Sequence, residues 1–188
     1  MPIVSTFEVL LKPQLPTDLP PTLNTVQNLG RNVIQGYFLT VANVNTFDLV
    51  LSLVFTTRLP AGVSIDEIIT FADTSGINIG GALEPDESGN KFRFSPLFLP
   101  ADATTLFILQ PNPTDTAISD LDIEARGFVE IQLSSLAGSV PPGAQIQVTA
   151  EQRGTFFADA TAVNLADRGL DQLAYGLTVQ NGGLLTLN

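Results

Sequence analysis

The chain contains neither cysteine nor histidine, and these two absences remove much of the chemistry that enzymes use. Without cysteine there is no disulfide, no thiolate nucleophile and no thiolate metal site. Without histidine as well there is no Ser-His-Asp triad, no Cys-His pair and no histidine-ligated zinc or iron centre. A Gly-rich phosphate loop followed by lysine and serine or threonine is also missing. Paired carboxylates remain, but 19 acidic residues provide such pairs by chance, so we expect no enzyme.

Basic residues are scarce. Lysine and arginine total 8 against 19 acidic residues, which gives a net charge of −11, and only Lys12 and Lys91 are lysines. Such a chain repels phosphate backbones and anionic lipid. The longest apolar stretch, Phe47 to Phe55, is interrupted by Asp48 and Ser52 and is far shorter than the roughly 20 residues that span a bilayer. We therefore expect neither a nucleic-acid partner nor membrane insertion.

Apolar residues, by contrast, are abundant. Hydrophobic residues make up 44% of the 188 residues and charged residues only 14%, a composition typical of a globular domain with apolar surface left over for contacts. This composition favours one globular unit that associates with itself.

The segment Met1–Ser5 lacks the basic, apolar and small-residue regions of a secretory signal, so we expect no signal peptide in this segment.

Alternation of apolar and polar residues is the strongest pattern. From Asp120 to Leu133 the odd positions are mostly apolar and the even positions mostly polar, as in a strand with one buried face. Gly127 keeps this parity and indicates a bend or the close approach of another element. Phe128 is the exception on the polar face and is a candidate contact residue.

The remaining patterns also predict strands. Phe47 to Thr57 is apolar on one face and partly apolar on the other, as in a central strand, and turn-forming asparagines before it predict a hairpin with Tyr37–Val41. We expect an all-β fold, an antiparallel β-sandwich of the Greek-key or jelly-roll kind with about nine strands. The predicted core is Leu39, Val41, Leu49, Leu51, Leu53, Leu121, Ile123, Val129, Ile131, Ile146 and Val148.

One short helix is predicted near residues 162–175. Its basis is the helical spacing of Val163, Ala166, Leu170 and Leu173.

We expect the chain to divide into two parts. Residues 1–24 form a strand followed by a proline-rich extended arm, and residues 25–188 form a single sandwich domain. The strand either joins the sheet of its own domain, the commoner arrangement, or is delivered to a neighbouring subunit. In the second case the apolar side chains of Phe7, Val9 and Leu11, with Phe128, are the expected assembly contacts.

An acidic ladder offers one possible metal site. Asp120, Asp122 and Glu124 project from one strand face and, together with Asp115, present oxygen ligands suitable for Ca²⁺. The commoner explanation is a solvated face that discourages edge pairing. No other cofactor is expected.

Two functions compete. The leading hypothesis is a structural, self-assembling protein such as a subunit of a surface layer, fibre or shell. The sequence leaves the compartment open, and a cell-surface or extracellular location is the expectation. The alternative is a module whose loops bind a carbohydrate or a protein. The absence of tryptophan and the presence of only two tyrosines weaken the carbohydrate version, because sugar faces commonly stack on these rings.

Overall fold

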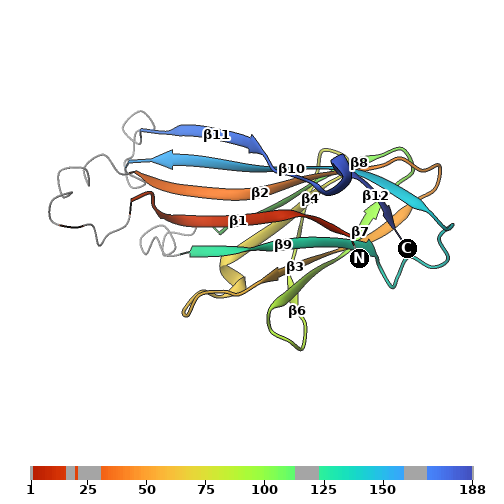
Figure 1. Cartoon of the computed structure of the whole chain (residues 1–188), viewed down its shortest axis with the longest axis horizontal. Coiled ribbons are helices and arrows are strands. Elements are labelled where there is room, and N and C mark those ends of the chain that lie inside the picture. Colours follow the sequence, from red (N-terminus) through yellow and green to blue (C-terminus); the bar gives the residue numbers. More distant parts are fainter. Residues whose placement is uncertain (1, 16–19, 21–30, 113–122, 159–168, 188) are drawn as a thin grey trace.

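The computed structural model of the chain describes residues 2–15, 20, 31–112, 123–158 and 169–187, which form twelve β-strands and short 3₁₀ turns (Figure 1). The strands are β1 (Ile3–Pro13), β2 (Asn32–Asn43), β3 (Leu49–Thr57), β4 (Ile68–Asp73), β5 (Asn78–Gly81), β6 (Glu84–Pro85), β7 (Lys91–Leu99), β8 (Thr104–Pro111), β9 (Ile123–Leu133), β10 (Ala144–Phe157), β11 (Asp171–Gly176) and β12 (Leu184–Leu187). Within these residues, no helix has the length and apolar character needed to cross a membrane.

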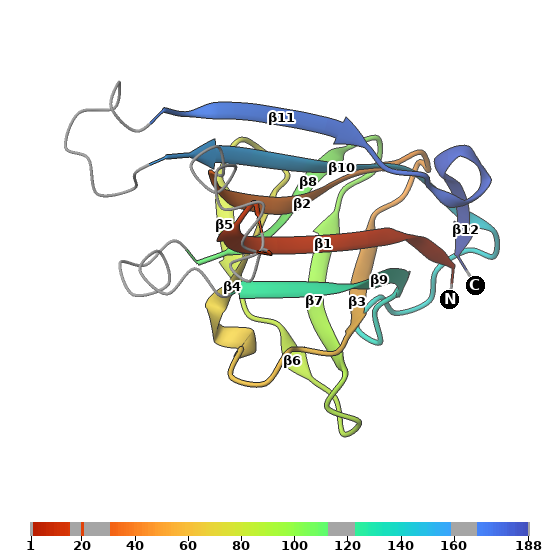
Figure 2. The same cartoon turned by 60° about the vertical axis from the view of Figure 1, so that its left-hand side comes forward.

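All twelve strands belong to one antiparallel sheet that curls into a half-barrel and forks at β2. One edge of β2 pairs with β10 over its whole length. The other edge pairs first with β1, through residues 32–35, and then with β8, through residues 37–42. One branch continues as β1-β9-β3-β7-β6 and the other as β8-β4-β5. Figure 2 shows β11, β10, β2, β1 and β9 side by side, with β3 and β7 crossing behind them.

The predicted all-β class and antiparallel pairing are confirmed, but the sandwich of about nine strands is not. The strand count was too low because β5, β6 and β11 are short or exposed and carry little apolar patterning. Since β2 belongs to both branches, hydrogen bonds join the two layers into one sheet, and a Greek-key or jelly-roll sandwich is not confirmed.

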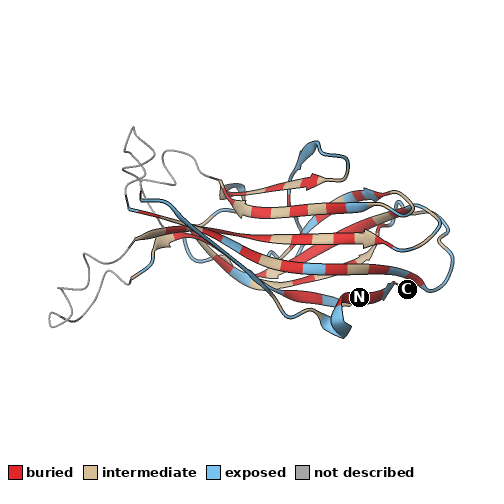
Figure 3. Ribbon diagram, turned by 90° about the horizontal axis from the view of Figure 1, so that it is seen from above, coloured by how far each residue is buried: buried red, intermediate tan, exposed pale blue. Residues whose placement is uncertain are grey.

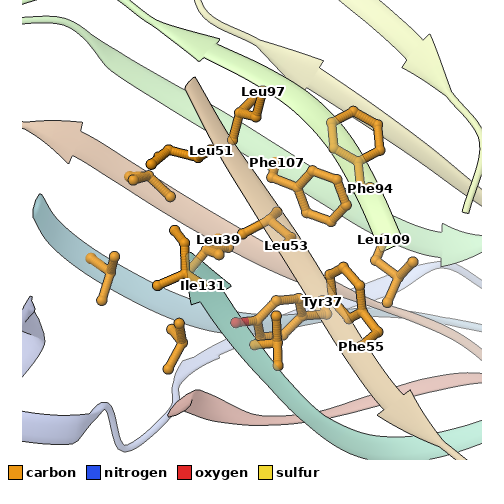
Figure 4. Close-up of a cluster of buried hydrophobic side chains, with 14 of the residues drawn as sticks. Tyr37, Leu39, Leu51, Leu53, Phe55, Phe94, Leu97, Phe107, Leu109 and Ile131 are labelled. Carbon is orange, nitrogen blue, oxygen red and sulfur yellow. The ribbon is translucent and has the colours of Figure 1, made fainter. Parts of the chain in front are cut away.

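The core draws its residues from both branches of the sheet, and Figure 3 shows buried residues alternating with less buried ones along the strands. Every residue of the predicted core that the structure describes is buried, and Leu121 lies outside the described residues. An aromatic group occupies the centre. Phe55 packs edge-on against Phe7 and Tyr37 and stacks on Phe107, with ring centroids 5.4, 6.4 and 5.5 Å away (Figure 4). The Tyr37 hydroxyl lies 2.8 Å from Ser5 Oγ, so this buried polar group has its partner.

The two strongest strand predictions are confirmed. β3 is a central strand, since it pairs with β7 on one edge and β9 on the other. In β9 the odd positions from Ile123 to Ile131 turn inward except at Gly127, as the alternation predicted. A Cβ at Gly127 would lie 1.9 Å from the carbonyl oxygen of Thr56 on β3, so this glycine does mark a close approach.

The predicted hairpin between Tyr37–Val41 and Phe47–Thr57 is wrong. β2 pairs with β1, β8 and β10, whereas β3 pairs with β7 and β9. The connection is a crossover held by buried Asn43, whose Nδ2 donates to the carbonyl oxygens of Phe47, Leu99 and Pro100 at 2.8, 3.1 and 3.0 Å. The asparagines therefore fix a link between layers rather than a tight turn.

The helix predicted near residues 162–175 is also wrong where the structure describes it. Residues 171–176 form β11, which pairs with β10 through six residue pairs. Residues 162–168 lie outside the described residues. The helical spacing of Leu170 and Leu173 does not mark a buried stripe, because their side chains are about half exposed. Leu177–Val179 is irregular and leads into the turn η4 (Gln180–Gly183).

Candidate functional site

The open edge of the sheet at β11 is the most unusual feature of the surface. All six residues of β11 are exposed, and in the part of the chain that the structure describes its one strand neighbour is β10 (Figures 1 and 2). Leu173 is 52% exposed and Tyr175 is 43% exposed. Their side chains share one face, because they are two positions apart on a strand.

The backbone groups that β11 leaves free follow from its register. The N–H of Leu177 donates to the carbonyl oxygen of Ala150 at 2.8 Å, and the register Glu151↔Gly176 to Phe156↔Asp171 continues without a shift. In an antiparallel pair, alternate residues bond to the neighbour and the residues between them point away. The odd residues of β11 therefore bond to β10, while Gln172, Ala174 and Gly176 turn their N–H and C=O groups outward.

β11 also lacks the usual devices that block an open edge. Natural edge strands are commonly short, or carry lysine, proline or a bulge. β6, at the other end of the sheet, has two residues and contains Pro85, and β5 has four residues of which two are glycine. β11 has six residues, regular pairing and neither lysine nor proline.

A groove of about 580 Å³ lies beside β11 where the two branches diverge. β2 contributes Ile34 and Phe38, β10 contributes Arg153, and β11 contributes Gln172 and Ala174. The Arg153 guanidinium lies over the Phe38 ring, 4.4 Å from its centroid, and Arg153 Nε donates to Glu151 at 3.0 Å. Such a guanidinium on an aromatic face contributes about 0.5–1 kcal/mol when exposed.

The charges nearest the edge are paired within the chain. Arg31 forms an ion pair with Asp171, the first residue of β11, and Arg153 does so with Glu151. A second strand approaching β11 therefore meets charges that already have partners.

The acidic ladder is only partly visible. Glu124 accepts a hydrogen bond from Lys12 and forms a second ion pair with Arg126, which also pairs with Glu8. The hydrogen bond from Lys12 lowers the pKa of the Glu124 carboxyl below its ordinary value. The carboxylate of Glu124 is thus already paired with two cationic side chains.

The other three predicted calcium ligands, Asp115, Asp120 and Asp122, lie outside the described residues, so the calcium site stays a prediction. In the described part of the chain no three Asp or Glu side chains gather as metal ligands would.

The predicted assembly residues of the first strand are turned into their own chain. β1 pairs with β9 along its length and with β2 at its end, and Phe7, Val9 and Leu11 are buried in the core. Phe128 is partly exposed on the outer face of β9, between Thr6 of β1 and Thr56 of β3. Sequence reasoning missed the exposed edge of β11, although the apolar residues Leu173 and Tyr175, two positions apart, were a weak signal for a strand there.

Comparison with protein-family models, curated proteins and solved structures found no match to this chain.

Proposed function

We propose that the protein is a non-enzymatic structural subunit that assembles by strand addition at the edge of β11. The observation that carries this proposal is the combination of outward backbone groups with exposed Leu173 and Tyr175 on an unblocked edge. An unpaired strand edge is a template for another strand, and soluble monomers normally protect theirs. The low charged fraction, 14%, fits a surface intended for contacts rather than for solvation.

The test compares the assembly state of three versions of the full chain across a wide concentration range, by sedimentation velocity and negative-stain microscopy. We expect the wild type to form larger species as concentration rises. Leu173→Lys places a charge at the exposed edge and should keep the protein monomeric. Thr149→Lys makes the same charge change at an exposed position of β10 and should assemble like the wild type. A wild type that stays monomeric throughout contradicts the proposal.

The groove supports a second candidate, a module that binds an extended segment of another protein. In this case the segment adds to β11, and those of its side chains that lie on the groove side are next to Gln172 and Ala174. Monomeric wild-type protein whose edge is protected from amide exchange only when a cellular partner is present would favour this candidate.

A further inference from the structure

We propose that the occupant of the β11 edge is β11 of a second copy of this chain, running antiparallel about a two-fold axis through Ala174. This inference rests on the proposed function and adds the partner, the strand direction and the register. It follows from three properties of β11: the direction of its free backbone groups, the order of its side chains and the charges beside it.

The backbone restricts the register. A two-fold axis perpendicular to the sheet places one residue opposite itself, and only residues that point outward can exchange backbone hydrogen bonds with the other copy. Gln172, Ala174 and Gly176 meet this condition because the odd residues bond to β10. Only the axis at Ala174 pairs all three of these outward residues with one another, with Ala174 opposite itself and Gln172 opposite Gly176 of the partner subunit. The axes at Leu173 and Tyr175 each pair only two of them. This arrangement provides about six backbone hydrogen bonds between the copies.

The side chains fit the same register. With the axis at Ala174, Leu173 lies opposite Tyr175 of the partner subunit, and the two-fold repeats this contact on the other side of the axis. These are the pairs without backbone hydrogen bonds, in which side chains approach most closely. A cross-strand aromatic–aliphatic pair contributes about 0.2–1 kcal/mol. Both side chains are about half exposed in the single chain and would be covered.

The charges permit the approach. Asp171, the one charged residue of β11, lies opposite Leu177 of the partner subunit in this register, so no like charges face each other. Asp171 is also held by Arg31 of its own chain. The edges at β5 and β12 offer only four residues each, and two of those in β5 are glycines, so fewer groups can pair there.

The first test removes one outward donor. Ala174→Pro deletes the N–H that points away from β10, and proline is tolerated on edge strands when its missing N–H faces solvent. We expect this variant to fold with the wild-type circular dichroism spectrum. The protein concentration at which it assembles should be at least tenfold higher than for the wild type. Ala174→Val keeps the N–H, suits a strand and should still assemble.

The second test captures the register through thiols, which is straightforward because the chain has no cysteine of its own. Leu173→Cys and Tyr175→Cys chains are mixed and oxidised. Positions 173 and 175 of opposite copies would have Cα atoms about 4.5 Å apart, within the range of a disulfide. We expect a disulfide-linked heterodimer from the mixture. Either chain alone should cross-link poorly, because its thiols are diagonal neighbours about 7–8 Å apart.

The outcomes separate this inference from the proposed function. If the wild type assembles while Ala174→Pro assembles equally well and the mixed thiols do not cross-link, the protein self-assembles by another surface and this inference is wrong. If the wild type does not assemble at all and the thiol mixture does not cross-link, both are wrong. Loss of assembly in Ala174→Pro, with cross-linking confined to the mixture, supports both.

Discussion

Asn45 Nδ2 donates to Asn43 Oδ1 at 2.7 Å, and this pair ties three distant parts of the sheet together. Asn43 binds the end of β7 through the carbonyl oxygens of Leu99 and Pro100. Asn45 binds the start of β10, giving a hydrogen bond to the Gln145 carbonyl oxygen at 2.6 Å and accepting one from its N–H at 3.0 Å. The crossover from β2 to β3 therefore depends on two amide side chains.

Asn43→Ala is expected to lower the free energy of unfolding by about 2–4 kcal/mol, because it leaves buried carbonyl oxygens without donors. Urea denaturation monitored by circular dichroism measures the change. Asn78→Ala, on the exposed strand β5, is the matched control and should change stability by less than about 0.5 kcal/mol. Equal, small effects of both substitutions would contradict a structural role for Asn43.

Gly127→Ala is expected to destabilise the protein by about 1–3 kcal/mol, because a Cβ there meets the Thr56 carbonyl oxygen and forces β9 and β3 apart. Gly80→Ala is the control on another strand, where the nearest atom to the new Cβ is 3.8 Å away. The difference between the two melting temperatures checks the prediction. A melting temperature of Gly127→Ala at or above that of the wild type would show that β3 moves to accommodate the new Cβ without loss of stability.

Burial raises the pKa of the Tyr37 hydroxyl above its ordinary value, and this gives an alkaline dependence of stability. Above about pH 10 the unfolded chain releases this proton while the folded chain retains it, so stability falls as the pH rises. Tyr37→Phe should remove this part of the alkaline loss, although it costs about 1 kcal/mol at neutral pH by leaving Ser5 Oγ without its partner. Urea titrations at neutral pH and near pH 11 measure both effects. An identical alkaline loss in the two proteins would contradict the assignment.

Added salt is expected to strengthen assembly. The chain carries a net charge of −11, so copies repel each other at low ionic strength, whereas backbone hydrogen bonds and the Leu173–Tyr175 contact are little affected by screening. Sedimentation at low and at physiological salt measures the shift toward larger species. Assembly that weakens as salt is added would instead point to ion pairs between subunits.

The sequence predicted best the long strands with strong apolar patterning. β9 alternates regularly, so its buried face was predictable, and β3 is apolar on one face and partly apolar on the other, so its central position was predictable. The packing of Gly127 was predictable too, since a glycine that interrupts a strand's apolar face needs a physical cause.

What could not be predicted depends on partners far away in the chain. Asn43 resembles a turn residue in sequence, and only its contacts with Leu99 and Pro100 reveal a crossover. Leu170 and Leu173 share a helical spacing, yet pairing with β10 decides that Leu173 belongs to a strand. The groove combines β2, β8, β10 and β11, so no local pattern marks it. Glu124 was expected among calcium ligands, but Lys12 and Arg126 reach it from other positions.

The pairing of β1 with β9 has a consequence for how the chain is made. Ile3 pairs with Glu130 and Leu11 with Ile123, so β1 is synthesised well before β9, the strand with which it pairs along its length. Pairings this distant along the chain form slowly, and unpaired apolar strands are prone to aggregate. During synthesis β1 is thus a segment that a chaperone would protect, and the core closes only once β10 and β12, which supply Ile146, Val148 and Leu185, have also emerged.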